Sequence, residues 1–451
     1  MGPLRVLFTF GPLAAAALLV APVQAGDETP AHLPALVELP SGAAAEAQTL
    51  TSWDAQPGDR FGHALAADGD WLLASAPRDD LQGRDSGSVA VFQSTRAGWR
   101  QTDRLEPSDG RAGDYFGFSM ALDGNLAVVG SPWDDDRGER TGSVYVFEWN
   151  GEDWVEQAKL TSFDAQPDDR FGHSVALDRG TLVVGARLAD EGGRDNGAVY
   201  VFERGASGWR ATAKIISPHV SEGAEFGFAV DIDGDLMAVG AWSDDRVGKD
   251  DGSAHIFRRG ATGWELEAEL YAENEAEAGC FGISVDLQGE RCAVGAPWES
   301  QEAPRGGAAY VFRYDIDHWV QEARVTAPTP RAGATFGIHV RLGGAELLVG
   351  SRGGSPDSPG AGAVDVFGRR RRDWAPRETL FLENSQVGDD FGLAFATLDG
   401  WWLVGCKRGH ADGRRGGPGL VRAWRQIAGS PEADSVLEPP ASSGNGRKGP
   451  R

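Results

Sequence analysis

Hydrophobic and polar positions along the chain follow a unit that recurs at one constant interval. Ten residues into a typical unit, Leu126 to Gly130 is a continuous apolar run, and Ser143 to Phe147 is a second run rich in β-formers. Runs of this kind predict strands that are covered on both faces. Each unit opens on a Phe-Gly pair, and the seven Phe residues are Phe61, Phe116, Phe171, Phe226, Phe281, Phe336 and Phe391.

Each unit divides into four predicted strands. In the second unit these cover 116–122, 126–130, 143–147 and 154–160, and Asp123-Gly124 is a hairpin signal between the first two. Four short strands in a repeat of this length are typical of one propeller blade. We therefore predict an all-β fold, a seven-bladed β-propeller with four antiparallel strands per blade. Six units also share a Trp at one fixed position after the Phe: Trp99, Trp154, Trp209, Trp264, Trp319 and Trp374.

The seventh unit lacks that Trp, and the strand that it misses is present at the other end of the chain. Leu50 precedes Phe61 by the same interval by which Leu160 precedes Phe171. We expect an N-terminal strand near residues 45–51 to pair with the last blade and close the ring. The propeller is then 45–427, with a flexible N-terminal segment at 26–44 and a disordered C-terminal tail at 428–451.

Residues 1–25 have the features of a signal peptide. Arg5 precedes an apolar run from Val6 to Val20, and Ala25 ends a small-residue cleavage site. The alternative, an uncleaved anchor, is disfavoured because the apolar run is short and interrupted by Pro12. We expect cleavage near Ala25, no membrane insertion afterwards, and a secreted protein that is extracellular, on the cell surface or periplasmic. The net charge of −24 argues against nucleic acid as a partner.

The repeat resembles FG-GAP repeats of the bacterial secreted type, most closely at residues 168–186. This resemblance implies a propeller similar to the N-terminal domain of integrin α-subunits, and an extracellular binding or adhesion role. Integrin-type repeats often carry a calcium loop in the hairpin before the Gly-Ala-Pro triplet. Here that hairpin is short, as at 122–126, and Asp231, Asp233 and Asp235 supply too few oxygens for calcium. We expect no metal site and no cofactor, with weak divalent cation binding by acidic loops left open.

Candidate ligand-binding residues lie in acidic loops that the topology places on one face. Carboxylates in Gly-rich loops hold cations or basic partners, and exposed indoles stack on sugars or anchor proteins. The alternatives are turns stabilised by Asx-type hydrogen bonds and Trp residues packed between blades. The candidates are Trp133, Asp134, Asp135, Asp136, Trp242, Asp244, Asp245 and Trp298.

We assign no catalytic residue. His63 and His173 share one repeat position without a nucleophile beside them, and Cys280, Cys292 and Cys406 fit no zinc spacing and are expected to be buried free thiols. The sequence therefore favours a non-enzymatic extracellular scaffold whose partner is a protein or a glycan of unknown identity. The alternative is a lectin-like or carbohydrate-processing propeller enzyme.

Overall fold

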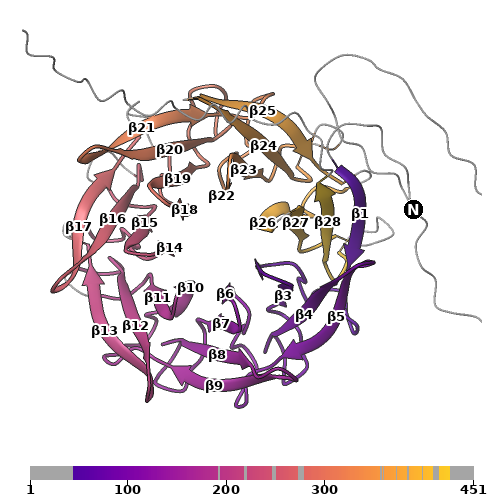
Figure 1. Cartoon of the computed structure of the whole chain (residues 1–451), viewed down its shortest axis with the longest axis vertical. Coiled ribbons are helices and arrows are strands. Elements are labelled where there is room, and N and C mark those ends of the chain that lie inside the picture. Colours follow the sequence, from indigo (N-terminus) through magenta and orange to yellow (C-terminus); the bar gives the residue numbers. More distant parts are fainter. Residues whose placement is uncertain are drawn as a thin grey trace, which may run out of the picture.

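The computed structural model describes residues 44–426, except 191–192, 218–220, 246–249, 273–278, 356–357, 359, 372, 383–384, 399 and 410–415. Seven four-stranded antiparallel sheets stand around a common axis, which confirms the predicted seven-bladed β-propeller (Figure 1). The predicted signal peptide, the tail at 428–451 and all but the last residue of 26–44 lie outside the described residues.

The first four blades follow one another along the chain. Blade one consists of β2 (Leu65–Asp68), β3 (Trp71–Ala76), β4 (Ser88–Thr95) and β5 (Gly98–Leu105). Blade two consists of β6 (Ser119–Asp123), β7 (Leu126–Ser131), β8 (Ser143–Trp149) and β9 (Trp154–Leu160). Blade three consists of β10 (Phe171–Asp178), β11 (Thr181–Ala186), β12 (Ala198–Gly205) and β13 (Gly208–Ile216). Blade four consists of β14 (Ala229–Asp233), β15 (Leu236–Ala241), β16 (Ser253–Gly260) and β17 (Gly263–Leu270).

The last three blades continue the order, and the seventh takes one strand from the N-terminal part of the chain. Blade five consists of β18 (Val285–Gln288), β19 (Arg291–Ala296), β20 (Ala308–Asp315) and β21 (His318–Val325). Blade six consists of β22 (His339–Gly343), β23 (Glu346–Ser351), β24 (Ala363–Arg370) and β25 (Asp373–Leu380). Blade seven consists of β26 (Phe391–Leu398), β27 (Trp401–Cys406), β28 (Leu420–Gln426) and β1 (Ala44–Leu50). The first strand of each blade lies nearest the axis (Figure 1).

The first strand of blade two starts later than the sequence predicts. The predicted strand begins at Phe116, whereas β6 begins at Ser119. The Phe116 amide donates to the carbonyl oxygen of Ser86 in blade one, at 2.9 Å, and Phe116 forms an isolated bridge with Gly87 of that blade, while pairing with β7 begins at Ser119. The Phe-Gly pair is thus a link between blades. In blade three, Phe171 makes the same link and also pairs with Ala186 of its own blade, so β10 begins at the Phe itself.

Gly142 shows why a small residue recurs opposite each Phe. It adopts a φ of +83°, and a Cβ built on it would lie 2.1 Å from the carbonyl oxygen of Phe171 in the next blade. No side chain fits there. In blade seven the same role falls to Gly419, which pairs with Phe61 across the closed ring.

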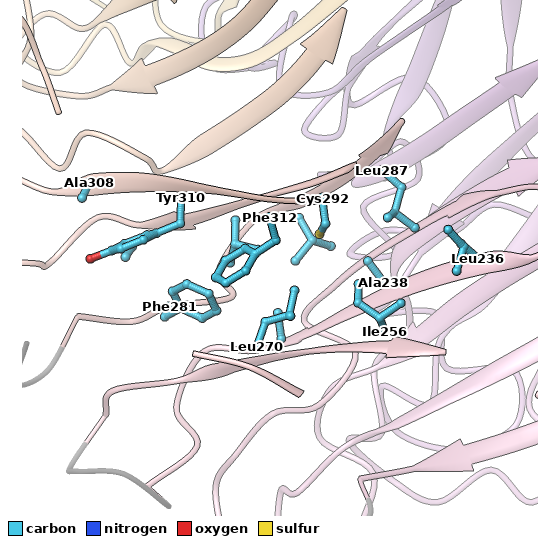
Figure 2. Packing of buried hydrophobic residues seen from close by; sticks show 14 residues of the cluster. Leu236, Ala238, Ile256, Leu270, Phe281, Leu287, Cys292, Ala308, Tyr310 and Phe312 are labelled. Atoms are coloured by element: carbon cyan, nitrogen blue, oxygen red, sulfur yellow. The ribbon is translucent and has the colours of Figure 1, made fainter. Parts of the chain in front are cut away.

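The hydrophobic core lies between neighbouring blades, as Figure 2 shows for blades four and five. Phe281 contributes from the start of blade five, and its ring lies 5.4 Å from that of Tyr310 and 6.0 Å from that of Phe312. These rings pack against side chains of blade four, which include Leu236, Ala238, Ile256 and Leu270. Each large apolar side chain buried in this way contributes roughly 1.5–3 kcal/mol.

The ring closes through the N-terminal strand, as predicted. Strand β1 pairs antiparallel with β28, with Leu50 opposite Val421 and Ala47 opposite Trp424. Leu50 is only 3% exposed, and Trp424 is fully buried. The three cysteines are free and buried, also as expected.

Candidate functional site

Two sets of loops build one face of the ring. One set joins the second and third strands of each blade, and the other joins each fourth strand to the next blade. We call their common surface the loop face; residues 132–142 and 161–170 are one of its loop pairs. The amides of Asp168 and Phe171 donate to the carbonyl oxygens of Glu139 and Thr141, both at 2.9 Å. The backbone of the loop face is therefore held by hydrogen bonds between the two sets.

Two of the predicted acidic residues are buried inside these loops. Asp134 is 2% exposed, and its Oδ2 accepts hydrogen bonds from the Tyr145 hydroxyl at 3.0 Å and the Lys159 ammonium at 2.7 Å. Asp244 is equally buried, and its Oδ2 accepts from the Ser253 hydroxyl at 2.8 Å. Neither carboxylate faces solvent, so neither reaches a ligand without rearrangement of its loop.

The other three predicted acids are exposed, and two of them shape their turns. Asp135 Oδ1 accepts a hydrogen bond from the Arg140 amide at 2.6 Å, and Asp245 Oδ1 accepts one from the Asp250 amide at 2.7 Å. In both bonds, which belong to two different blades, the amide lies 5 residues after the Asp. Asp136 has a different role, because it forms ion pairs with Arg111 and Lys159. The five predicted acids are not gathered into one cluster.

The predicted tryptophans are half-buried. The ring of Trp133 lies 4.8 Å from Tyr115 and 4.9 Å from Phe118, and the Arg170 guanidinium stacks over it at 4.7 Å. Trp242 and Trp298 contact each other, with their ring centroids 6.0 Å apart. The structure brings the last two together. Trp133 is linked to them through intervening rings, because the series that runs from Phe118 to Phe228 ends 5.9 Å from Trp242.

Rings from successive blades form an arc along the inner edge of the loop face. Each lies two positions after the repeated Phe: His63 is 5.1 Å from Phe118, Phe118 is 5.1 Å from His173, and His173 is 4.8 Å from Phe228. Burial, together with nearby Arg and Lys side chains, lowers the pKa of both histidines to about 3. Both imidazoles are therefore neutral at physiological pH.

Five cations gather beside this arc, where blades six, seven and one meet. We call Arg60, Arg78, Arg352, Lys407 and Arg408 the axial cation cluster. Arg60 directly precedes a Phe-Gly pair, and the other four follow the ends of β3, β23 and β27. The pKa of Lys407 is lowered to about 8 by burial and by Arg352, Arg60 and Arg408, against the opposing effect of Asp390. The sequence analysis missed this cluster, because its members belong to three different blades.

Two exposed aromatic residues on the loop face were also missed. Trp53 is 66% exposed and Phe163 is 64% exposed. Both stand at the same position before their Phe-Gly pair, in the loops that lead into blades one and three. An aromatic residue that recurs at one position of a polar loop was the available sequence signal.

The acids nearest to a calcium pattern point to different partners. Asp231 Oδ2 accepts from the Leu287 amide and Asp233 Oδ2 from the Gly289 amide, both at 2.6 Å. Within the described ranges, no group of three or more His, Cys, Asp or Glu residues is placed to hold a metal ion. The same residues include no helix of the length and hydrophobicity that a membrane span requires.

Comparison with known protein families matches the chain to the FG-GAP repeat. The model of the FG-GAP repeat matches five segments, 45–92, 99–147, 154–202, 209–257 and 264–312, which together make up more than half of the 451 residues. Each segment begins at or near the fourth strand of one blade and ends within the third strand of the next. The sequence repeat therefore straddles the boundary between blades.

Proposed function

Because this chain belongs to the FG-GAP repeat family, we propose that it is a non-enzymatic extracellular scaffold that binds a protein or glycan ligand with its loop face. The FG-GAP propeller fold by itself suggests a binding role, and the architecture is consistent with the propeller of integrin α-subunits. The predicted signal peptide at 1–25 supports an extracellular setting.

The observation that carries this proposal is the pair of exposed rings at Trp53 and Phe163. Large aromatic side chains that remain in solvent on a well-held backbone are typical anchors of binding surfaces. The Trp53 amide donates to Gln101 Oε1 at 3.0 Å, and the ring of Phe163 packs at 5.5 Å from Tyr200. The backbone of Trp53 and the ring of Phe163 are thus held by the adjacent blade before any ligand arrives, which lowers the entropy cost of binding.

Buried carboxylates give the loops the same preorganisation. Asp59 Oδ2 accepts from the Gln56 amide at 2.6 Å, and Asp114 and Asp169 do the same for Arg111 and Gln166 at 2.7 and 2.8 Å. Burial raises the pKa of all three to about 6. These acids stabilise the turns that carry the exposed side chains.

The histidines of the arc support binding rather than catalysis. With pKa values of about 3, His63 and His173 lie far from the range in which a general base works near neutral pH. Each lies against aromatic rings of neighbouring blades, so a packing role accounts for its position.

The test begins with a screen of the mature protein against immobilised glycans and extracellular matrix proteins. For any ligand found, Trp53→Ala and Phe163→Ala should each raise the dissociation rate at least tenfold and leave the melting temperature unchanged. The matched control is Ile316→Ala, which removes a 92% exposed apolar side chain from a turn on the opposite face. Faster dissociation in the control alone would contradict the proposal.

A further inference from the structure

We propose that the axial cation cluster binds a polyvalent oxyanion: a sulfate, a phosphate or a set of clustered carboxylates carried by the ligand. The inference rests on the proposed function, since the cluster lies at the inner edge of the loop face. It adds the chemical class of the group that this face recognises. Arginine and lysine side chains that converge from several elements are the usual partners of such anions.

Among the described residues, ion pairs join three of the five cations of the cluster, Arg78, Lys407 and Arg408, to a carboxylate. Lys407 Nζ and Arg408 Nε lie 3.7 and 3.9 Å from the same oxygen, Oδ2 of Asp390, and both distances are too long for a hydrogen bond. Within the described part of the chain, the side chains of Arg60 and Arg352 form no ion pair or hydrogen bond. In the described ranges, one carboxylate is therefore shared by Lys407 and Arg408, and Arg60 and Arg352 have no carboxylate partner.

Burial makes this excess of positive charge costly. The side chain of Lys407 is only 12% exposed, and the Nε atom of Arg78 is buried without a hydrogen-bond partner, 3.7 Å from Asp85. The lowered pKa of Lys407 reflects that burial and the repulsion from neighbouring guanidinium groups. An oxyanion between these groups would offset the repulsion and supply the missing acceptors. The whole chain has a net charge of −24, so a local surplus of cations is not a consequence of composition.

The inner edge of the loop face on the opposite side of the ring provides an internal comparison. Arg170 stands at the repeat position of Arg60, and its Nη2 lies 3.5 Å from Asp168. Arg187 stands at the repeat position of Lys407, and its guanidinium forms an ion pair with Glu225. The chain thus pairs both of these cations of blade three with an acid. Among the described residues, it leaves Arg60 and Lys407 without a hydrogen-bonded acid where blades six, seven and one meet.

Two aromatic rings on the loop face favour an anion over a cation as the bound group. Their faces already carry guanidinium groups of the chain itself: Arg170 lies 4.7 Å from the centroid of Trp133, and Arg305 lies 5.0 Å from that of Trp298. At these two rings a cation of the chain itself already takes the place where a cationic ligand would stack.

The experiment is a calorimetric titration of the mature protein with sodium sulfate, sodium phosphate and sodium citrate at pH 7, with ionic strength held constant by sodium chloride. We expect saturable binding of at least one anion. The double variant Arg60→Gln/Lys407→Gln should bind it at least tenfold more weakly. The control Arg84→Gln/Arg137→Gln removes the same charge from exposed positions in the loops that join the second and third strands of blades one and two. Its affinity for the anion should stay within twofold of that of the wild type. Comparing the affinities for sulfate and phosphate with the affinity for citrate distinguishes a site for a tetrahedral group from a site for clustered carboxylates.

A second variant guards against misfolding. Arg352 is exposed, so Arg352→Glu does not disturb packing, and it should weaken the same anion at least fivefold. The inference is overturned if the wild type binds none of the three anions saturably, or if the double variant and its control bind equally. Neither result depends on the ligand screen. Failure of the titration leaves the roles of Trp53 and Phe163 standing, and a ligand insensitive to those two residues would contradict the proposed function alone.

Discussion

Asp123 Oδ2 accepts a hydrogen bond from the backbone amide of Arg179, which lies in the next blade, at a distance of 2.7 Å. The carboxylate of one inner hairpin thereby caps the inner hairpin of its neighbour. The same bond recurs three times, from Gly124 to Asp68, from Gly234 to Asp178 and from Gly289 to Asp233. The Asp of each of these hairpins therefore ties adjacent blades together as well as turning the chain.

Calcium should not stabilise the protein, because these hairpin carboxylates already accept hydrogen bonds from backbone amides. Asp231 and Asp233, the closest approach to a calcium loop, each accept from a backbone N–H of blade five. A calcium site with a Kd of about 10 µM would add roughly 2.7 kcal/mol at about 1 mM calcium. We expect the melting temperatures in millimolar calcium chloride and in EDTA to agree within a degree. A gain of several degrees that chelation reverses would contradict this.

Closure by β1 predicts a large effect at its last residue. Leu50 is 3% exposed and packs between β28 and blade one, so Leu50→Ala should lower the free energy of unfolding by about 2–5 kcal/mol. The neighbouring Thr51 is exposed, and Thr51→Ala serves as the control in the same urea titration. Deletion of 26–52 should likewise destabilise the protein far more than deletion of 430–451. Equal unfolding midpoints in either comparison would refute the closure.

Asp365 should make stability depend on pH. Burial raises its pKa from 3.8 to about 7, against the hydrogen bond that its Oδ1 accepts from Thr379 Oγ1 at 2.5 Å. The native state then holds a proton that the unfolded state releases, so this contribution is present below pH 4 and is lost as the pH rises to about 7. Asp365→Asn should be more stable than the wild type at pH 8, on the order of a few kcal/mol, with a much smaller difference at pH 5.

The control for Asp365→Asn is Asp235→Asn, which changes an exposed carboxylate on an inner hairpin. Urea unfolding at pH 5 and pH 8 measures both variants. The account requires the pH-dependent gain in the first variant and none in the second. A loss of stability at pH 8 in Asp365→Asn would show that the buried carboxylate is stabilising when it is charged.

Lys407 should give anion binding its own pH dependence. Its pKa of about 8 means that the ammonium is lost just above neutrality; the charged groups that act on it are Asp390, Arg352, Arg60 and Arg408. Sulfate affinity should therefore fall between pH 7 and pH 9.5, and binding near pH 8 should take up a proton. Lys407→Arg should shift that fall to higher pH, since the guanidinium remains charged. Affinity that is flat across this range would exclude Lys407 from the site.

The fold could be predicted because its signals repeat. A Phe-Gly pair, an apolar run and a hairpin at the same spacing reinforce one another seven times, and the position of Leu50 relative to Phe61 identified the closing strand. Where the strand start was wrong, at Phe116, the residue bridges to Gly87 of another blade, and pairing with β7 of its own blade begins only at Ser119. Local pattern cannot show such a bond.

The candidate site could be predicted only in part, because burial and assembly across blades are tertiary properties. Asp134 and Asp135 are adjacent in an acidic loop, yet one is buried and the other exposed. The axial cation cluster joins a position just before one Phe-Gly pair to positions just after the second strands of blades one, six and seven. Only ring closure brings Arg60 beside Arg408, and no spacing along the chain signals that.

The most direct test of the binding face is hydrogen exchange on the mature protein, with and without a ligand from the screen. The account predicts that amide protection will concentrate in the loops around Trp53 and Phe163 and at the inner edge near Arg60, where the loop face lies. The turns on the opposite face, around Asn150 and Ile316, should exchange at unchanged rates. Protection confined to those opposite turns would contradict the account.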